Sequence, residues 1–257
     1  MSVAPKFVTS RDNPLLVRLR KLAGDPAGYR KHGEVWLEGD HLCRAYVQHG
    51  RPVTHAVLTE AAWDDPELRA LASHADAITV LPAALMAGLS TLESPAPLAF
   101  LVPWEGQAGL KAHTPSIVLD RLQDAGNVGT LLRSAAAFGF TQVVAIKGTA
   151  ALWSSKVLRA GMGAHFGLHL VEGVVAADLG QLAIPLLATS SHAALSLPEA
   201  DLPWPCAWVM GHEGRGVGDD LMAQCALTVR IPQPGGEESL NVAAAAAICL
   251  YESRRQG

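Results

Sequence analysis

Short apolar runs that alternate with helical patterns constrain the fold of this chain more than any other feature of its sequence. Ten such runs occur, at residues 35–37, 53–58, 77–81, 98–102, 116–119, 143–146, 168–171, 185–188, 206–210 and 227–231. Helical patterns occupy residues 14–24, 128–138 and 154–162, and a last one extends from residue 242 to residue 254. Strands that alternate with helices predict an α/β fold with a mostly parallel sheet and helices on both of its faces.

A segment that is rich in glycine and proline separates two groups of these runs. It reads PWEGQAGLKAHTP over residues 103–115 and has no apolar periodicity, which is typical of linkers between domains. We therefore predict a smaller amino-terminal α/β domain over residues 1–104, a linker over 105–115 and a carboxy-terminal domain over 116–257. The length of 257 residues suits either one large domain or two of ordinary size.

The composition indicates a globular protein with a substantial core. Hydrophobic residues make up 49% of the chain and charged residues 17%, which excludes wholesale disorder. No apolar run reaches the roughly 18 residues of a membrane-spanning helix, and the amino terminus lacks a basic-then-apolar signal pattern, so we expect a cytoplasmic protein. The four cysteines show no C-x-x-C spacing, which argues against a zinc site and a disulfide framework and predicts buried thiols.

Basic residues are concentrated near the amino terminus. The net charge of the chain is −4, but residues 1–31 contain seven lysines and arginines and only two aspartates. This segment therefore carries +5 and the remainder −9. A local basic patch attracts phosphate groups even on an acidic protein, and Arg11, Arg18 and Lys21 are its candidates for contacts to nucleic-acid phosphates. A solvated basic helix face explains the same charges equally well.

Two glycine-rich loops follow neighbouring apolar runs in the last part of the chain. The run at 206–210 ends at Gly211, and three further glycines follow by residue 218; the run at 227–231 ends at a Pro-Gln-Pro-Gly-Gly sequence. In open α/β sheets ligands bind outside the carboxyl ends of the strands, and glycine allows a close approach of backbone to ligand. The sequence thus predicts a ligand-binding edge. The alternatives are that both loops are ordinary turns and that Ser239 caps the last helix.

A third segment, residues 119–139, places polar groups after another apolar run. Asp120, Asp124, Asn127 and Arg133 lie at the expected strand-to-helix turn and in the first turns of the helix. Asn127 is equally suited to cap that helix, and an arginine on a helix is commonly a surface residue. The glycines of the second segment do not form a dinucleotide fingerprint, because Gly214, Gly216 and Gly218 miss the G-x-G-x-x-G spacing.

Together the three segments resemble the SpoU (TrmH-type) family of RNA ribose methyltransferases, within the SPOUT superfamily. The first family motif corresponds to Asn127, Gly129, Arg133 and Phe138-Gly139, and the second to Gly211-His212-Glu213-Gly214-Arg215-Gly216. The third corresponds to Ile231-Pro232, Gly235, Ser239-Leu240-Asn241-Val242 and Tyr251-Glu252. Residues 9–14, TSRDNP, look like the start of the substrate-binding domain that many members carry, whereas Ala125 stands where the family often has proline.

The resemblance implies a carboxy-terminal domain with a trefoil knot, and a homodimer that methylates a ribose 2′-hydroxyl in rRNA or tRNA. It also implies that S-adenosylmethionine is the methyl donor. Its predicted binding residues are Gly211, Ile231, Leu240, Thr189, Gly216 and Ser239. The predicted catalytic residues are Arg133, which orients the hydroxyl and an adjacent phosphate, and Asn127, Glu213 and Asn241, which shape the pocket. Methyl transfer from a sulfonium is an in-line displacement that needs alignment more than a metal, so no metal is expected. No membrane is expected either, because no apolar run is long enough to span one.

Two functions from other classes compete with this interpretation. One is an RNA-binding assembly factor that binds the donor without turnover, which the intact motif residues disfavour. The other is a nicotinamide-dependent dehydrogenase, which the glycine spacing disfavours. Calorimetry with S-adenosylmethionine and with NAD distinguishes the dehydrogenase from the methyltransferase.

Overall fold

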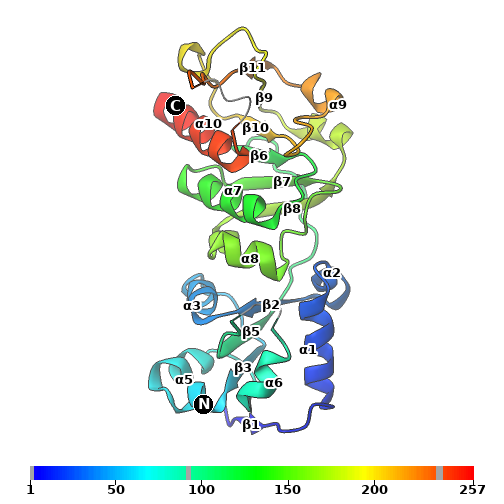
Figure 1. The fold of residues 1–257 in the computed structure, drawn as a ribbon, viewed down its shortest axis with the longest axis vertical. Helices are drawn as coiled ribbons and strands as arrows, with labels where there is room; N and C mark the ends of the chain where they lie inside the picture. The colour runs from blue at the N-terminus through cyan, green and yellow to red at the C-terminus, as the bar shows by residue number, and fades with distance from the viewer. Residues whose placement is uncertain (1–2, 91–93, 236–239) are drawn as a thin grey trace. The chain divides into compact units, whose positions relative to one another are not determined.

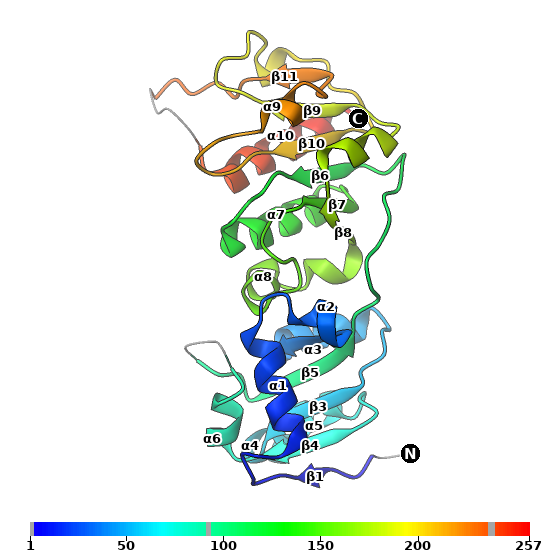
Figure 2. The same cartoon turned by 90° about the vertical axis from the view of Figure 1, so that its right-hand side faces the viewer.

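The computed structural model describes residues 3–90, 94–235 and 240–257. The chain divides into two compact units, which are described separately (Figures 1 and 2). Unit 1 comprises Met1–Gly106 and Trp153–Phe166, and unit 2 comprises Gln107–Leu152 and Gly167–Gly257. None of the described helices is both long and apolar enough to span a membrane.

Unit 1 is built on a five-stranded mixed sheet. Its strand order is β1 (Lys6–Phe7), β4 (Ile78–Leu81), β3 (His55–Thr59), β5 (Leu98–Pro103) and β2 (Glu34–Glu38). The pairs β1–β4 and β3–β4 are parallel, whereas β5 is antiparallel to both β2 and β3. The helices of this unit are α1 (Pro14–Gly24), α2 (Gly28–His32), α3 (Asp40–Gln48), α4 (Glu60–Asp64), α5 (Pro66–Ala72), α6 (Ala83–Ala87) and α8 (Ser155–Gly161). Figures 1 and 2 show α1 on one face of the sheet and α3 and α5 on the other.

Helix α1 forms where the sequence predicts it. The Asn13 side chain accepts a hydrogen bond from the backbone N–H of Leu15 at 3.0 Å, and Pro14 occupies the first turn, where its missing N–H costs nothing. Leu16, Leu19 and Leu22 recur at helical spacing and are buried. The basic side chains between them remain on the outer face.

Unit 2 is built on a six-stranded, fully parallel sheet. Its strand order is β11 (Leu227–Val229), β9 (Leu186–Thr189), β10 (Ala207–Met210), β6 (Ser116–Leu119), β7 (Gln142–Ile146) and β8 (His169–Val174). The chain proceeds outward from β6 to β8 and then returns to build the other half from β9, β10 and β11. The strand order therefore reverses at β6 and β10, and an open parallel sheet binds its ligands beyond the carboxyl ends of strands at such a point.

Different kinds of structure cover the two faces of this sheet. Helices α7 (Ala125–Ala137) and α10 (Val242–Gln256) pack against each other and against the sheet, and the buried Trp208 of β10 donates a hydrogen bond from its indole to the Ser253 hydroxyl of α10 at 2.8 Å. On the opposite face the core includes Leu221 of the short helix α9 (Asp219–Met222) and Leu179 of a 3-10 helix (Ala176–Gln181). Figure 2 shows α9 and α10 on opposite sides of the strands.

All ten predicted apolar runs overlap strands of the structure, so the predicted α/β alternation and mostly parallel sheet are confirmed. Strand β1 was missed, because its two residues are exposed and form no apolar run. The cysteines are free thiols, of which Cys43, Cys206 and Cys249 are buried and Cys225 is half-buried. Burial raises the pKa of Cys206 and of Cys225 to about 11, so these thiols are protonated at neutral pH.

The division of the chain departs from the predicted one in two places. Residues 153–166 belong to unit 1, because α8 packs against β2 and Phe166 contacts Tyr46 of α3 in an edge-to-face geometry. The segment 107–115 belongs to unit 2 and is tied to its sheet. Within it, the Lys111 backbone N–H donates to the side-chain oxygen of Gln142 at 2.8 Å, and the Gln142 amide donates back to the Lys111 carbonyl at 3.1 Å.

Candidate active site

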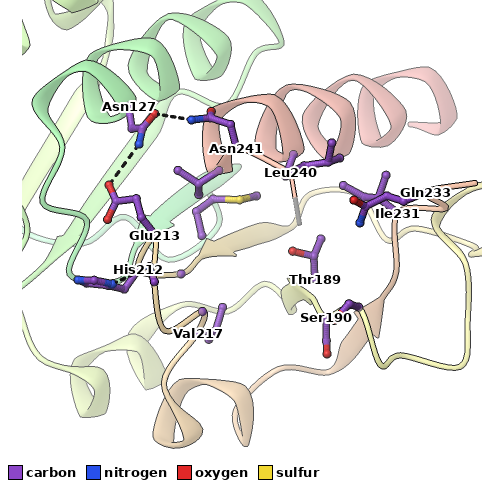
Figure 3. A pocket seen from close by; sticks show the side chains of 17 residues that line it. Asn127, Thr189, Ser190, His212, Glu213, Val217, Ile231, Gln233, Leu240 and Asn241 are labelled. Carbon is purple, nitrogen blue, oxygen red and sulfur yellow. Dashed lines mark hydrogen bonds between the residues drawn. The ribbon is translucent and has the colours of Figure 1, made fainter. Parts of the chain in front are cut away.

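A pocket of about 630 Å³ lies beyond the carboxyl ends of the central strands of unit 2 (Figure 3). This volume is within the range of small-molecule sites, about 300–1,000 Å³. Its walls come from the end of β9, from the loop after β10, from the segment after β11 and from the first turns of α7 and α10. The lining residues are Asn127, Thr189, Ser190, Ser191, Met210, Gly211, His212, Glu213, Gly214, Gly216, Val217, Ile231, Gln233, Leu240, Asn241, Val242 and Ala245.

The loop at residues 211–218 folds back on itself so tightly that its first residue must be glycine. A Cβ atom at Gly211 would lie 2.2 Å from the carbonyl carbon of Gly216 and 2.2 Å from the backbone nitrogen of Val217. His212 and Gly216 exchange backbone hydrogen bonds of 3.0 and 2.8 Å, and Gly216 has a φ of 69°. The loop therefore presents bare backbone toward the pocket.

A buried carboxylate anchors the far end of this loop. Asp120, the first residue after β6, is fully buried and accepts a hydrogen bond from the Gly218 backbone N–H at 2.8 Å. It also accepts two from the guanidinium of Arg121, at 2.7 and 3.0 Å. These hydrogen bonds and the charge of Asp120 raise the pKa of Arg121. The charge of Asp120 is thus balanced, and two neighbouring strand ends are joined.

A chain of hydrogen bonds connects the same loop to the starts of α7 and α10. The Asn127 amide donates to the Glu213 carboxylate at 3.3 Å, and the Asn127 carbonyl accepts from the Asn241 amide at 3.0 Å. Asn241 in turn accepts from the backbone N–H groups of Ala243 and Ala244 at 2.9 and 3.3 Å. Figure 3 shows Asn127 between Glu213 and Asn241, with a hydrogen bond to each.

The chemistry of the two ends fixes the direction of this chain. A carboxylate can only accept, so Asn127 must turn its NH₂ group to Glu213 and its carbonyl to Asn241. Asn241 must then donate to Asn127, which leaves its carbonyl for the helix N–H groups. If either amide were reversed, two donors or two acceptors would face each other. Glu213, Asn127 and Asn241 therefore behave as one unit that holds three segments in a single arrangement.

The Glu213 carboxylate is held in its ionised form. Partial burial acts to raise the pKa of Glu213. The backbone N–H groups of Glu213, Asp124 and Gln123 and the Asn127 amide all stabilise the charged form, and the net effect is a pKa below its usual value. The N–H groups of Asp124 and Gln123 lie 3.2 and 3.4 Å from its oxygens. At neutral pH Glu213 is therefore an acceptor and not an acid.

Comparisons with known proteins agree with this geometry. Residues 115–251 match the SpoU rRNA Methylase family. An uncharacterized tRNA/rRNA methyltransferase of Synechocystis is 33% identical over 258 residues, which cover 97% of this chain and 93% of the relative. The chain belongs to the SpoU rRNA methylase family.

A second relative and a solved structure extend the comparison. The 23S rRNA (guanosine(2553)-2′-O)-methyltransferase RlmP of Bacillus subtilis is 34% identical over 141 residues, 54% of this chain and 57% of RlmP. A crystal structure of an RNA 2′-O ribose methyltransferase superposes with a TM-score of 0.81 at 28% identity and covers 98% of this chain and 99% of that one. The match to RlmP thus spans little more than half of either protein.

The structure brings most of the predicted SpoU site residues into this one pocket. Of the residues predicted to bind the donor, the pocket is lined by Gly211, Ile231, Leu240, Thr189 and Gly216. Of the predicted catalytic residues, it is lined by Asn127, Glu213 and Asn241. Ser239 lies outside the described residues.

Arg133 is placed differently from the other predicted catalytic residues. It lies on α7, is exposed, and is not among the residues that line the pocket. Within the described part of the chain its guanidinium has no hydrogen bond or ion pair. The three predicted RNA-binding residues, Arg11, Arg18 and Lys21, are exposed in unit 1, and Arg18 forms an ion pair of 3.2 Å with Glu34.

Both alternative helix caps considered from the sequence are wrong. Helix α7 begins two residues earlier than Asn127, and its cap is Asp124, which accepts from the Asn127 backbone N–H at 2.6 Å. Helix α10 is capped by Asn241 and not by Ser239. The side chain of Asn127 is therefore free to join the hydrogen-bond chain.

Several residues of the pocket were not predicted from the sequence. They include Ser190, Ser191, His212, Val217 and Gln233. Ser190, Ser191 and His212 follow the end of a strand within two residues, which was an available signal, whereas Val217 and Gln233 lie further along their loops. Among the described residues, no group of three histidine, cysteine, aspartate or glutamate side chains is arranged to hold a metal ion.

Proposed function

We propose that this protein transfers a methyl group from S-adenosylmethionine to the 2′-hydroxyl of a ribose in rRNA or tRNA. The observation that carries the proposal is the pocket at the strand ends of unit 2, which is lined by the 211–218 loop and by the hydrogen-bonded residues Glu213, Asn127 and Asn241. It lies in a chain of the SpoU family, and the similar RNA 2′-O ribose methyltransferase shares the fold over nearly its whole length.

The residues present suit the methyl donor. The pocket offers apolar surface at Ile231 and Leu240, hydroxyl groups at Thr189 and Ser190, and close backbone approach at Gly211. Such a mixture matches a ligand that combines an aromatic base, a ribose and a charged amino-acid tail. When bound, the sulfonium of the donor supplies an electrophilic methyl group.

The residues of the chain then position the acceptor. Glu213, Asn127 and Asn241 keep the loop and two helix starts in register, so that the reacting groups can be aligned. Arg133 orients the ribose hydroxyl and an adjacent phosphate through its planar guanidinium. An arginine remains protonated at neutral pH, so orientation and charge stabilisation are its role. Its exposed guanidinium has no protein partner among the described residues, which supports this assignment.

The proposal includes a trefoil knot in the carboxy-terminal segment. The chain from β11 returns to the middle of the unit, where α10 packs against α7 and β10. The Asn241–Asn127 hydrogen bond joins this late segment to the first helix of the unit. A knot is rare in proteins, and this close return of the chain end supports one here.

A homodimer formed partly through α10 is also proposed. Ile248 and Tyr251 of α10 are exposed at 42% and 56%, and Tyr251 stacks edge-to-face on Phe138 with ring centroids 6.0 Å apart. An exposed apolar face of this kind suits a symmetric interface. Light scattering that shows only monomers at micromolar concentration would reject it.

RNA docking is assigned to unit 1 through Arg11, Arg18 and Lys21. Phosphate contacts release counterions, so the affinity for RNA should fall with salt. Replacement of all three by alanine should weaken RNA binding and flatten its salt dependence while the affinity for the donor stays unchanged. If both the affinity and the slope survive, the RNA surface lies elsewhere.

The function is tested by mapping 2′-O-methylated riboses in total rRNA and tRNA from a strain that lacks the protein. We expect the loss of a specific site, its restoration by the wild-type chain, and no restoration by the Arg133→Lys variant. Calorimetry with S-adenosylmethionine and with NAD provides the control for ligand class. Unchanged methylation in the deletion strain, together with no binding of S-adenosylmethionine, would overturn the proposal.

A further inference from the structure

Gln233 places a buried polar atom in the wall of the pocket. It lies in the segment after β11, and its side-chain oxygen is buried and has no hydrogen-bond partner among the described residues. A buried carbonyl without a donor is unfavourable, because it has lost its hydrogen bonds to water. An orphaned acceptor in a pocket wall indicates where a ligand presents a donor.

The local sequence explains why the described neighbours of Gln233 along the chain do not satisfy this oxygen. Gln233 stands between Pro232 and Pro234, and neither proline has a backbone N–H to donate. The following proline also restricts the backbone of Gln233 to extended conformations. The side chain therefore leaves a stiff backbone in a fixed direction, with few local donors within reach.

The surroundings of Gln233 select one kind of ligand group. Figure 3 shows Gln233 beside Ile231, at the side of the pocket opposite Glu213. Ile231 and Leu240 provide apolar surface for a flat ring, and the amide carbonyl is a neutral acceptor. A ligand ammonium group is better matched by the carboxylate of Glu213, and ribose hydroxyls by the hydroxyl groups of Thr189 and Ser190.

We propose that the side-chain carbonyl of Gln233 accepts a hydrogen bond from the exocyclic amino group of the donor's adenine, which makes Gln233 a specificity-determining residue. The inference rests on the proposed function, because it assumes that S-adenosylmethionine occupies the pocket. Ile231 and Leu240 hold the ring, and Gln233 distinguishes a purine that carries a 6-amino group from one that lacks it.

The test is calorimetric binding of two product analogues to the intact protein. One is S-adenosylhomocysteine, and the other is its counterpart with unsubstituted purine in place of adenine, which lacks the amino group. The wild-type protein should bind the second about tenfold more weakly, as expected for the loss of one buried hydrogen bond. Gln233→Met, which keeps the size but removes the acceptor, should bind both with equal affinity.

A second variant and a matched control complete the design. Gln233→Glu keeps an acceptor and should retain the preference for adenine. It should also reject the hypoxanthine counterpart, since two acceptors would then face each other, whereas the wild-type amide can turn its NH₂ group to that oxygen. Gln181→Met alters an exposed glutamine outside the pocket and should discriminate as the wild type does.

The outcomes separate the two levels of the argument. If the wild type binds S-adenosylhomocysteine but Gln233→Met discriminates as strongly as the wild type, the role of Gln233 is wrong and the proposed function stands. If the wild type does not bind S-adenosylhomocysteine at all, both fall. Should Gln233→Met fail to fold, as judged by thermal melting, loss of the adenine preference in Gln233→Glu overturns the inference.

Discussion

The two units of this chain are both α/β sheets, but their strands end in different ways. In unit 1, β3 ends at Thr59 and α4 begins at the next residue, and only Pro82 separates β4 from α6. In unit 2, residues 211–218 separate β10 from α9, and residues 230–241 separate β11 from α10. The two units therefore differ chiefly in the length of the connections that follow their strands.

This difference decides which unit has the candidate active site. In unit 1 the turn is closed by the protein itself, since the Thr59 hydroxyl accepts from the Ala62 backbone N–H at 3.2 Å and caps α4. In unit 2 the longer loops enclose a pocket and leave backbone groups facing it. The α/β layering alone therefore does not make a site; the loops grafted on it do.

The largest loss of activity is expected when a side chain is added at Gly211, the first residue of the 211–218 loop. In Gly211→Ala the new Cβ would overlap the backbone of Gly216 and Val217, so the loop must shift. A displacement of about 1 Å can cost 10²-fold in activity, and we expect methyl transfer to fall by at least that factor with weaker binding of the donor.

The matched control for that variant is Gly180→Ala, because a Cβ at Gly180 meets no atom within 4 Å. It should retain both activity and donor affinity. Isothermal calorimetry and single-turnover transfer are the measurements. Normal donor affinity in Gly211→Ala would show that the loop does not form the donor site.

The next largest loss of activity is expected from replacing Arg133, which lies in unit 2 but outside the pocket. If its guanidinium orients the ribose hydroxyl and a phosphate, lysine cannot replace it. Arg133→Lys should lower kcat by about 10²-fold with donor affinity unchanged, as for a group that acts in the transition state. An exposed arginine without a catalytic role contributes only about 0–1 kcal/mol to stability. Near-normal turnover in Arg133→Lys would therefore show that Arg133 is an ordinary surface residue.

Much of this comparison could be predicted from the sequence. The strands are short apolar runs with clear ends, and burial on both faces keeps that signal strong. Glycine, asparagine and glutamate at the ends of two such runs were enough to indicate the pocket. These features are local, so the sequence displays them directly.

The rest depends on packing between distant segments. The assignment of residues 153–166 to unit 1 results from contacts with β2 and α3, which periodicity cannot express. Asp124 caps α7, so the side chain of Asn127 is available to Glu213 and Asn241, residues that are remote in sequence. The sequence also gives no sign that the side-chain oxygen of Gln233 is buried without a hydrogen-bond partner among the described residues.

Two helix caps, one in each unit, test the comparison with an effect of intermediate size on stability and activity. Thr59 caps α4 after a strand of unit 1, and Asp124 caps α7 after a strand of unit 2. Thr59→Val and Asp124→Ala should each lower the free energy of unfolding by about 1 kcal/mol. Only Asp124→Ala should also slow methyl transfer, because it loosens the position of Asn127. Equal activity in the two variants, at matched stability loss, would contradict the assignment.

The smallest effect is expected on the pH dependence of the free energy of unfolding. The pKa of Glu213 is lowered in the folded protein, so its contribution to stability is fully present above the ordinary glutamate pKa of about 4.3 and is lost as the pH falls through the lowered value. Glu213→Gln should therefore be less stable than the wild type at pH 7, and the difference should shrink in the acid range. Chemical unfolding between pH 7 and pH 3 measures it, and a constant difference would refute the ionised role.

The most direct measurement is hydrogen exchange of the intact protein with and without S-adenosylhomocysteine, read by mass spectrometry. The ligand should slow exchange in peptides that contain residues 211–217 and 231–233 of unit 2. Peptides that contain the strand ends of unit 1, residues 59–65 and 81–88, should exchange at unchanged rates. Protection at the strand ends of unit 1, or none at residues 211–217, would contradict the claim that the long loops of unit 2 form the site.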